Sequence, residues 1–370
     1  GKTLEDNIFA ESGEEIRAIE KVVKINQKDH AQGHICPNVG KWIRYGPAGL
    51  LEITNDKLVN SGPAKAEFYK SVILSLEASC DFIRRYSALA KELSGREADP
   101  VLTENLREIS SVCARISKNP PSCLREAVQS VWFLFVILQM ESNASSFSPG
   151  RMDQYLYPYF ENDIRSGRLN YESALELIDA LVIKFNHIVY LRDSHSAKDF
   201  AGFPIGFNVS LGGKMQDGTD AVNMLSFLFL KAQDHIRFPQ PNLTARLHRS
   251  TTDEFFDECT RIISLGTGMP QLVNDESIVT ALESAGVSNE DAIDYAVVGC
   301  VELSTTGNFL GWSDAAMFNM VKALELTLNN GVCMLTGEQT GLATGNLTDY
   351  SDYAELEKAF ERQIDYFIDR

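Results

Sequence analysis

The chain has few basic residues and no long apolar run, and each shortage argues against a class of protein. Its 34 lysine and arginine residues stand against 51 aspartate and glutamate residues, which gives a formal charge of −17. No basic run is longer than Arg84-Arg85, so the sequence offers no positive stripe for nucleic acid or an anionic membrane surface. The longest uninterrupted apolar run, Val131 to Leu138, is too short to span a bilayer.

The chain also lacks paired cysteines and the marks of a secretory leader. The first residues, GKTLEDNIFAESGEE, have neither the charged nor the apolar part of a signal peptide. Seven cysteines, an odd number, occur without any C-x-x-C pair, at positions 36, 80, 113, 123, 259, 300 and 333. This pattern predicts reduced thiols, with neither a disulfide framework nor a zinc site. We expect a soluble cytoplasmic protein.

Helical patterns alternate with short strand patterns along the sequence. This alternation predicts one large α/β fold with strands inside and helices outside. Strands are expected in the second half of 191–213, over 242–248 and just before Gly299. The helices are expected over 5–27, 58–93 (with a break at Gly62-Pro63), 100–117, 122–140, 170–189, 220–234, 252–265 and 315–329.

The segment from Tyr295 to Gly331 carries the strongest chemical signal. An apolar run stops at Gly299 and is followed by Cys300 and Glu302. If this segment is extended, the two side chains point to the same side, because side chains alternate with period two. A neighbouring carboxylate raises the pKa of a thiol, so the pair is poorly suited to Cys–His hydrolysis. It suits a sulfur that reacts as a neutral radical while the carboxylate acts as a base.

Two other loops have polar residues in unusual settings, and each has two interpretations. His34 lies between Gly33 and Pro37, where a histidine either makes a structural hydrogen bond or lines a pocket. The stretch ESNASSFSPGR, residues 141–151, follows an apolar helix. It is either a turn that ends the helix or a loop whose hydroxyl groups face a small polar ligand.

The sequence resembles the glycyl radical enzymes, the pyruvate formate-lyase-like superfamily. Gly299-Cys300-Val301-Glu302 is similar to the Cys-loop motif of that family. Four longer segments are also similar, in the same order, at 141–160, 238–248, 265–276 and 294–302. The ordered matches cover almost the whole chain.

This resemblance implies a ten-stranded β/α barrel made of two half-barrels and surrounded by helices, here present only in part. Residues 1–370 would form one partial catalytic domain, with the Cys loop at about 296–314. The resemblance also implies a glycyl radical as cofactor, installed by an activating enzyme that uses S-adenosylmethionine and an iron–sulfur cluster. The segment that carries the radical glycine in the family, of R-V-x-G-Y type, does not occur in these 370 residues. We therefore expect a piece of a longer enzyme.

The family assigns roles to the two residues of the Cys loop. By position, Cys300 would become the thiyl radical that removes hydrogen from substrate carbon, and Glu302 would deprotonate the neighbouring hydroxyl. Pyruvate formate-lyase has two adjacent cysteines at this site, whereas Gly299 replaces the first here. The resemblance therefore favours elimination of water from a small hydroxylated substrate, as in the glycerol and propanediol dehydratases, over acyl cleavage.

Further residues of a substrate pocket follow from the same resemblance. Asp314, in a G-W-x-D stretch, would bind the diol hydroxyls, although an aspartate there is also suited to capping the following helix. His34 would assist departure of the second hydroxyl as water. Ser146 and Ser148 match the serine side of the pocket, and Phe207 its wall.

Two alternatives stay open at the level of sequence. One is a glycyl radical lyase that cleaves a C–S, C–N or C–C bond, as in the sulfonate, choline and arylacetate lyases. The other is a catalytically inert scaffold. The expected partners are a small diol-like substrate, the activating enzyme and a second copy in a homodimer, and no metal ion is expected in the site.

Overall fold

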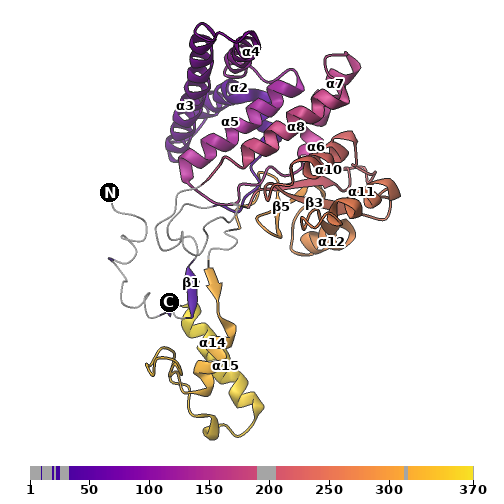
Figure 1. Ribbon diagram of the computed structural model, residues 1–370. Coiled ribbons are helices and arrows are strands. Elements are labelled where there is room, and N and C mark those ends of the chain that lie inside the picture. Colours follow the sequence, from indigo (N-terminus) through magenta and orange to yellow (C-terminus); the bar gives the residue numbers. More distant parts are fainter. Residues whose placement is uncertain are drawn as a thin grey trace. The chain divides into compact units, whose positions relative to one another are not determined.

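The computed structural model describes residues 10, 19–20, 22–25, 33–189, 206–311 and 316–369. The chain divides into two compact units, whose elements are labelled in Figure 1. The larger unit draws on residues 33–191 and 200–311, and the smaller on residues 1–32, 192–199 and 312–370. The catalytic candidates that the structure describes all belong to the larger unit.

The larger unit begins with four helices. Helix α2 is kinked where Gly46 takes a positive φ of 64° just before Pro47. A proline at the first position starts α3 and also α4, which Asp99 caps by accepting hydrogen bonds from two backbone N–H groups. The helices expected over 100–117 and 122–140 are confirmed to within two residues. Their bounds are α2 (Val39–Val59), α3 (Pro63–Ser94), α4 (Pro100–Ile116) and α5 (Leu124–Ser142).

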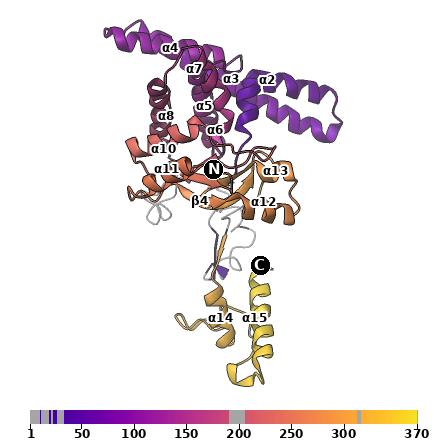
Figure 2. The same cartoon turned by 90° about the vertical axis from the view of Figure 1, so that its right-hand side faces the viewer.

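A second group of helices surrounds a small sheet. Asn170 caps α8 as predicted, accepting a hydrogen bond from the Ser173 N–H, but the helix ends at Phe185 and not at residue 189. Helices α10 and α11 connect the strands and lie beside the sheet (Figure 2). The bounds are α6 (Met152–Tyr155), α7 (Tyr157–Arg165), α8 (Tyr171–Phe185), α10 (Met224–Ile236), α11 (Asp253–Ile263), α12 (Asp275–Ser284) and α13 (Asn289–Ile293).

The sheet has three parallel strands in the order β2 (Asn208–Gly212), β3 (Asn242–Leu247) and β4 (Gln271–Asn274). Asn208 pairs with Asn242, and Thr244 with Gln271. Every residue of β2 is buried, as expected for a parallel strand covered on both faces. The predicted α/β class is confirmed, and the strand expected at 242–248 is present. The described residues form partial sheets only.

A separate antiparallel hairpin lies next in the chain. Strand β5 (Tyr295–Val298) pairs with β6 (Glu302–Thr305), and Val298 is the register partner of Glu302. Three residues, 299–301, make the turn between them. Gly299 has a φ of +57°, a value that favours glycine. The hairpin therefore projects the residue after Gly299 at its tip.

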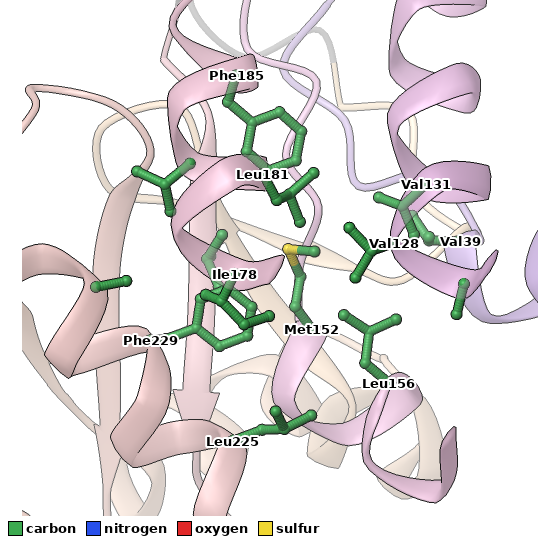
Figure 3. Close-up of a cluster of buried hydrophobic side chains, with 14 of the residues drawn as sticks. Val39, Val128, Val131, Met152, Leu156, Ile178, Leu181, Phe185, Leu225 and Phe229 are labelled. Atoms are coloured by element: carbon green, nitrogen blue, oxygen red, sulfur yellow. The ribbon is translucent and has the colours of Figure 1, made fainter. Parts of the chain in front are cut away.

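Apolar side chains from the helices and the sheet form one large core in this unit. Figure 3 shows part of it, where residues of α5, α6, α8 and α10 point toward one another. Met152 and Leu156 are fully buried between them. Burial of each such side chain stabilises the fold by about 1.5–3 kcal/mol relative to exposure. This core supports β2, and with it the loops that reach the hairpin.

The smaller unit corrects two expectations. Its elements are β1 (Val23–Ile25), β7 (Ala316–Phe318), α14 (Met320–Leu328), a short 3-10 helix (Leu347–Asp349) and α15 (Tyr353–Ile368). The helix expected over 5–27 is wrong at its end, where β1 pairs with β7. The helix expected over 315–329 starts later, at Met320, with Asn319 as its cap. Asp314 therefore does not cap it.

No helix in the part of the chain that the structure describes is both long and apolar enough to cross a membrane.

Candidate active site

The β5–β6 turn exposes Cys300 and places Glu302 at its base. Cys300 is exposed, and Val301 beside it is 69% exposed. Glu302 is the first residue of β6. The two residues do not share one extended strand, so the period-two argument for their common direction is wrong. Cys300 lies in the turn, and Glu302 begins the strand after it.

Glu302 forms a close ion pair with His34, which lies 268 residues away in the sequence. His34 Nδ1 and Glu302 Oε1 are 2.6 Å apart, and the side chains are 7% and 22% exposed. The backbone N–H of Val301 donates to the other carboxylate oxygen over 3.0 Å. Partial burial alone would raise the pKa of Glu302, but the hydrogen bonds from His34 and Val301 outweigh it and lower that pKa. Because an ionised carboxylate only accepts, His34 Nδ1 carries the proton in this contact.

Glycine at position 299 is a condition for this pair. A Cβ atom there would lie 2.6 Å from Glu302 Oε2 and 2.9 Å from His34 Nδ1. Such distances are shorter than van der Waals contact. Any side chain at 299 therefore competes for space with the His34–Glu302 pair, which gives a physical reason for a glycine at this position.

The loop that carries His34 is fixed by the polar stretch at 145–148. The His34 N–H donates to the Ser145 carbonyl over 3.0 Å, and the Ser148 N–H donates to the Ile35 carbonyl over 2.9 Å. His34 itself has a φ of +54°. Gly33 approaches Ser145 so closely that a Cβ would strike its carbonyl. Because His34 also pairs with Glu302, the structure brings together the His34 loop, the 145–148 stretch and the turn that carries Cys300.

The two predicted serines have different surroundings. Ser146 is 4% exposed with a φ of +60°, and its hydroxyl lies against Gly206. A Cβ on Gly206 would also lie 3.6 Å from the Gly299 Cα, so Ser146 is near the turn. Ser148 is fully buried, and its hydroxyl accepts from the Asn208 N–H over 3.2 Å. That bond links the loop to the first residue of β2.

Phe207, expected as the wall of the pocket, contributes its ring to the core. Phe207 is fully buried, and its ring packs against Phe135 and Phe185 at centroid distances of 5.6 and 5.2 Å. These contacts belong to the core among the helices. Asp314 lies outside the described residues. Substrate contact by Asp314 therefore stays a prediction.

A second cysteine, which the sequence gave no reason to select, lies behind the hairpin. Cys36 is 1% exposed and packs against Ala296 and Val298 of β5. Burial raises the pKa of its thiol to about 12, so the group is a neutral thiol. Its backbone carbonyl accepts from the Gly307 N–H over 2.7 Å. Cys36 therefore connects the His34 loop to β5 and to the segment that follows β6.

No group of three or more histidine, cysteine, aspartate or glutamate side chains is arranged to hold a metal ion in the described ranges.

Comparison with known proteins gives consistent matches over the whole chain. The family model described as "Pyruvate formate lyase-like" matches residues 1–370. The (2S)-3-sulfopropanediol dehydratase of Klebsiella oxytoca is 34% identical over 385 residues, which cover 100% of this chain and 46% of that protein. An isethionate sulfite-lyase of Oleidesulfovibrio alaskensis is 32% identical over 338 residues, which cover 89% of this chain and 41% of that protein.

A solved structure agrees. The glycerol-bound form of the B12-independent glycerol dehydratase from Clostridium butyricum matches with a TM-score of 0.93 and 36% identity. The match covers 100% of this chain and 48% of that one. The chain therefore spans about half the length of the proteins it matches.

Proposed function

Because the chain belongs to the pyruvate formate lyase-like family, we propose that residues 1–370 form part of the catalytic domain of a glycyl radical lyase that dehydrates a small neutral diol. One observation carries this proposal: a His34–Glu302 pair with a 2.6 Å contact lies beside the turn that presents Cys300. The parallel sheet beside this turn agrees with a ten-stranded barrel of two half-barrels, with the Cys loop at about 296–314. The dehydratases among the relatives support the type of reaction.

The position of Cys300 suits activation by a radical. A glycyl radical, installed by an activating enzyme that uses S-adenosylmethionine and an iron–sulfur cluster, would supply the acceptor for the hydrogen atom of the Cys300 thiol. Its glycine is expected on a segment outside these 370 residues. Cys300 fits this chemistry because it lies at the exposed tip of a turn, where a second segment can reach it.

The chain's own residues then divide the elimination between them. Cys300 takes a hydrogen atom from the hydroxyl-bearing C1, and Glu302 takes the proton of the C1 hydroxyl. The C2–O bond breaks, and the departing hydroxide leaves as water with a proton from His34. C1 becomes a carbonyl, the unpaired electron moves to C2, and Cys300 returns its hydrogen there. The His34–Glu302 pair gains one proton and gives one, so its proton count is unchanged.

Other parts of the pocket would hold the substrate. Ser146 lies near the turn and is the serine better placed to form a hydrogen bond with a diol hydroxyl. Asp314 would bind the diol hydroxyls. We assign Ser148 a supporting role, because its hydroxyl already binds β2, and Phe207 a role in the core.

The Glu302 carboxylate favours a hydroxyl group, and not a sulfonate, as its direct neighbour in the pocket. Glu302 is ionised, and an anionic group placed beside it would be repelled. The isethionate sulfite-lyase match makes C–S cleavage the second candidate. For the whole enzyme we propose a homodimer that acts under anaerobic conditions in the cytoplasm.

The test is a substrate panel on the activated full-length enzyme. Glycerol, propane-1,2-diol and short hydroxysulfonates are incubated in parallel, and aldehyde and sulfite are measured. Aldehyde from a diol, dependent on activation, supports the proposal. Release of sulfite from a hydroxysulfonate, with no aldehyde from either diol, would replace it with the C–S lyase, and neither product from an enzyme that holds its radical would overturn both.

A further inference from the structure

The hairpin that carries Cys300 is not part of the parallel sheet. Within the described residues, β5 forms a backbone ladder with β6 and with no strand of the three-stranded sheet. One side-chain bond connects β5 to β2, where the Val297 N–H donates to Ser210 Oγ over 3.1 Å. Other interactions must therefore fix the position of β5 relative to the sheet, and with it the position of Cys300.

A buried arginine supplies most of these interactions. Arg246, on β3, is fully buried and donates to the carbonyl of Ile293 and to that of Tyr295, each over 2.8 Å. Its guanidinium lies 3.8 Å from the centre of the Tyr295 ring, within cation–π range. The same group thus holds the first residue of β5 by its carbonyl and by its ring.

Arg246 is itself held in a single orientation. Asp275, also fully buried, accepts from Arg246 Nε and Nη2 over 3.0 and 2.9 Å, a bidentate geometry. The Tyr295 hydroxyl donates to the same carboxylate over 2.7 Å. Gly213 closes the remaining side, because a Cβ there would lie 2.6 Å from Arg246 Nε. No rotation of the guanidinium is possible without breaking several bonds.

A second arginine binds the same stretch of backbone. Arg151, 7% exposed, donates through Nη1 to the Ile293 carbonyl over 3.4 Å and to Asp294 over 3.1 Å. Through Nη2 it donates to the carbonyls of Gly212 and Lys214, over 3.1 and 3.0 Å, at the end of β2. The two guanidinium groups together bind residues 293–295, where the chain enters β5.

We propose that Arg246 is a positioning residue for Cys300. By binding the carbonyls of Ile293 and Tyr295, it fixes the position of β5 relative to the parallel sheet and so the position of Cys300 at the hairpin tip. The inference rests on the proposed function for its turnover readout. Arg246 touches no reacting atom. A displacement of about 1 Å at a reacting group costs up to a hundredfold in rate, so a small slip of β5 is enough to reduce hydrogen-atom transfer.

The experiment compares three variants of the activated full-length enzyme. Arg246→Lys keeps the charge but loses the bidentate geometry of the guanidinium. Tyr295→Phe keeps the ring but loses the hydrogen bond of the hydroxyl to Asp275. Arg261→Lys is the matched control, since Arg261 is 45% exposed and its bonds to Glu258 and Asp234 are on the surface. Tyr295→Phe keeps the test valid if Arg246→Lys does not fold.

The readouts separate positioning from general stability. We expect a kcat per glycyl radical that falls about tenfold or more in both site variants, with KM within about twofold and radical content close to wild type. The control should match wild type. If instead Tm and radical content fall while kcat per radical stays at the wild-type value, Arg246 is only structural and the proposal is overturned.

A readout without substrate separates failure of this inference from failure of the proposed function. In D2O the Cys300 S–H becomes S–D, and transfer of that deuterium atom to the glycyl radical and back exchanges the remaining α-hydrogen of the glycine. The electron paramagnetic resonance doublet then collapses to a singlet. Slower collapse in Arg246→Lys and Tyr295→Phe supports positioning even if no diol is turned over, and collapse at the wild-type rate contradicts it.

Discussion

Replacing Gly299 by alanine disturbs the His34–Glu302 pair while changing the stability of the fold only a little. An alanine Cβ would lie 2.6 and 2.8 Å from the two carboxylate oxygens of Glu302 and 2.9 Å from His34 Nδ1. Glu302 can move away, because its carboxylate is the end of a flexible side chain. Alanine at a φ of +57° adds a backbone cost of about 1–2 kcal/mol. We therefore expect a small loss of stability and a large loss of activity.

The expected size of the activity loss follows from geometry. The carboxylate has to move by several tenths of an ångström or more to restore normal contact, and the 2.6 Å hydrogen bond to His34 cannot survive in place. Misplacement of a base by about 1 Å costs up to a hundredfold in rate. The assay is kcat per glycyl radical on the activated enzyme, with thermal unfolding measured in parallel.

A matched variant isolates crowding from backbone strain. Gly266 has a φ of +80°, and a Cβ there would meet nothing within 4 Å. Gly266→Ala therefore carries the same kind of backbone cost without touching the site, and its activity per radical should equal that of wild type. If Gly299→Ala keeps activity within about twofold of Gly266→Ala, the pair does not perform the chemistry.

Three further changes test single residues. Cys300→Ser should accept a glycyl radical normally and show no turnover, and any retained turnover would contradict the thiyl assignment. His34→Ala removes the main hydrogen bond that lowers the pKa of Glu302 below its ordinary 4.5. The acidic limb of the pH profile of kcat, where the base is lost as pH falls, should therefore move to higher pH. An unchanged limb would contradict the role of the pair. Asp314→Asn should raise KM for diols and lower turnover, and unchanged kinetics would remove Asp314 from the pocket.

The local sequence predicts which residues carry the chemistry, but it does not predict how they are arranged in space. Cys300 and Glu302 are two residues apart and were found by their types and by Gly299. His34 could be selected only as one of two alternatives, because its partner lies 268 residues away. The ion pair follows from the tertiary fold, in which the 33–36 loop runs beside residues 145–148.

The features that the sequence does not predict have similar causes. Ala316–Phe318 has an apolar pattern that suits a helix, yet it pairs with β1, a partner that no local pattern reveals. Phe207 precedes a strand whose two faces are both buried, so its direction could not be read from hydrophobicity. The buried Arg246 and Arg151 look like surface charges in the sequence, because their acceptors are mainly backbone carbonyls of distant residues.

The path of one hydrogen atom tests the central claim most directly. Activated enzyme is given propane-1,2-diol that carries two deuterium atoms on C1, and the propanal is analysed by mass spectrometry and NMR. If Cys300 takes the atom from C1 and returns it to C2, the product has one deuterium on the carbonyl carbon and one on C2. Propanal with deuterium on C1 alone, or no propanal from enzyme that shows its glycyl doublet, would contradict the account.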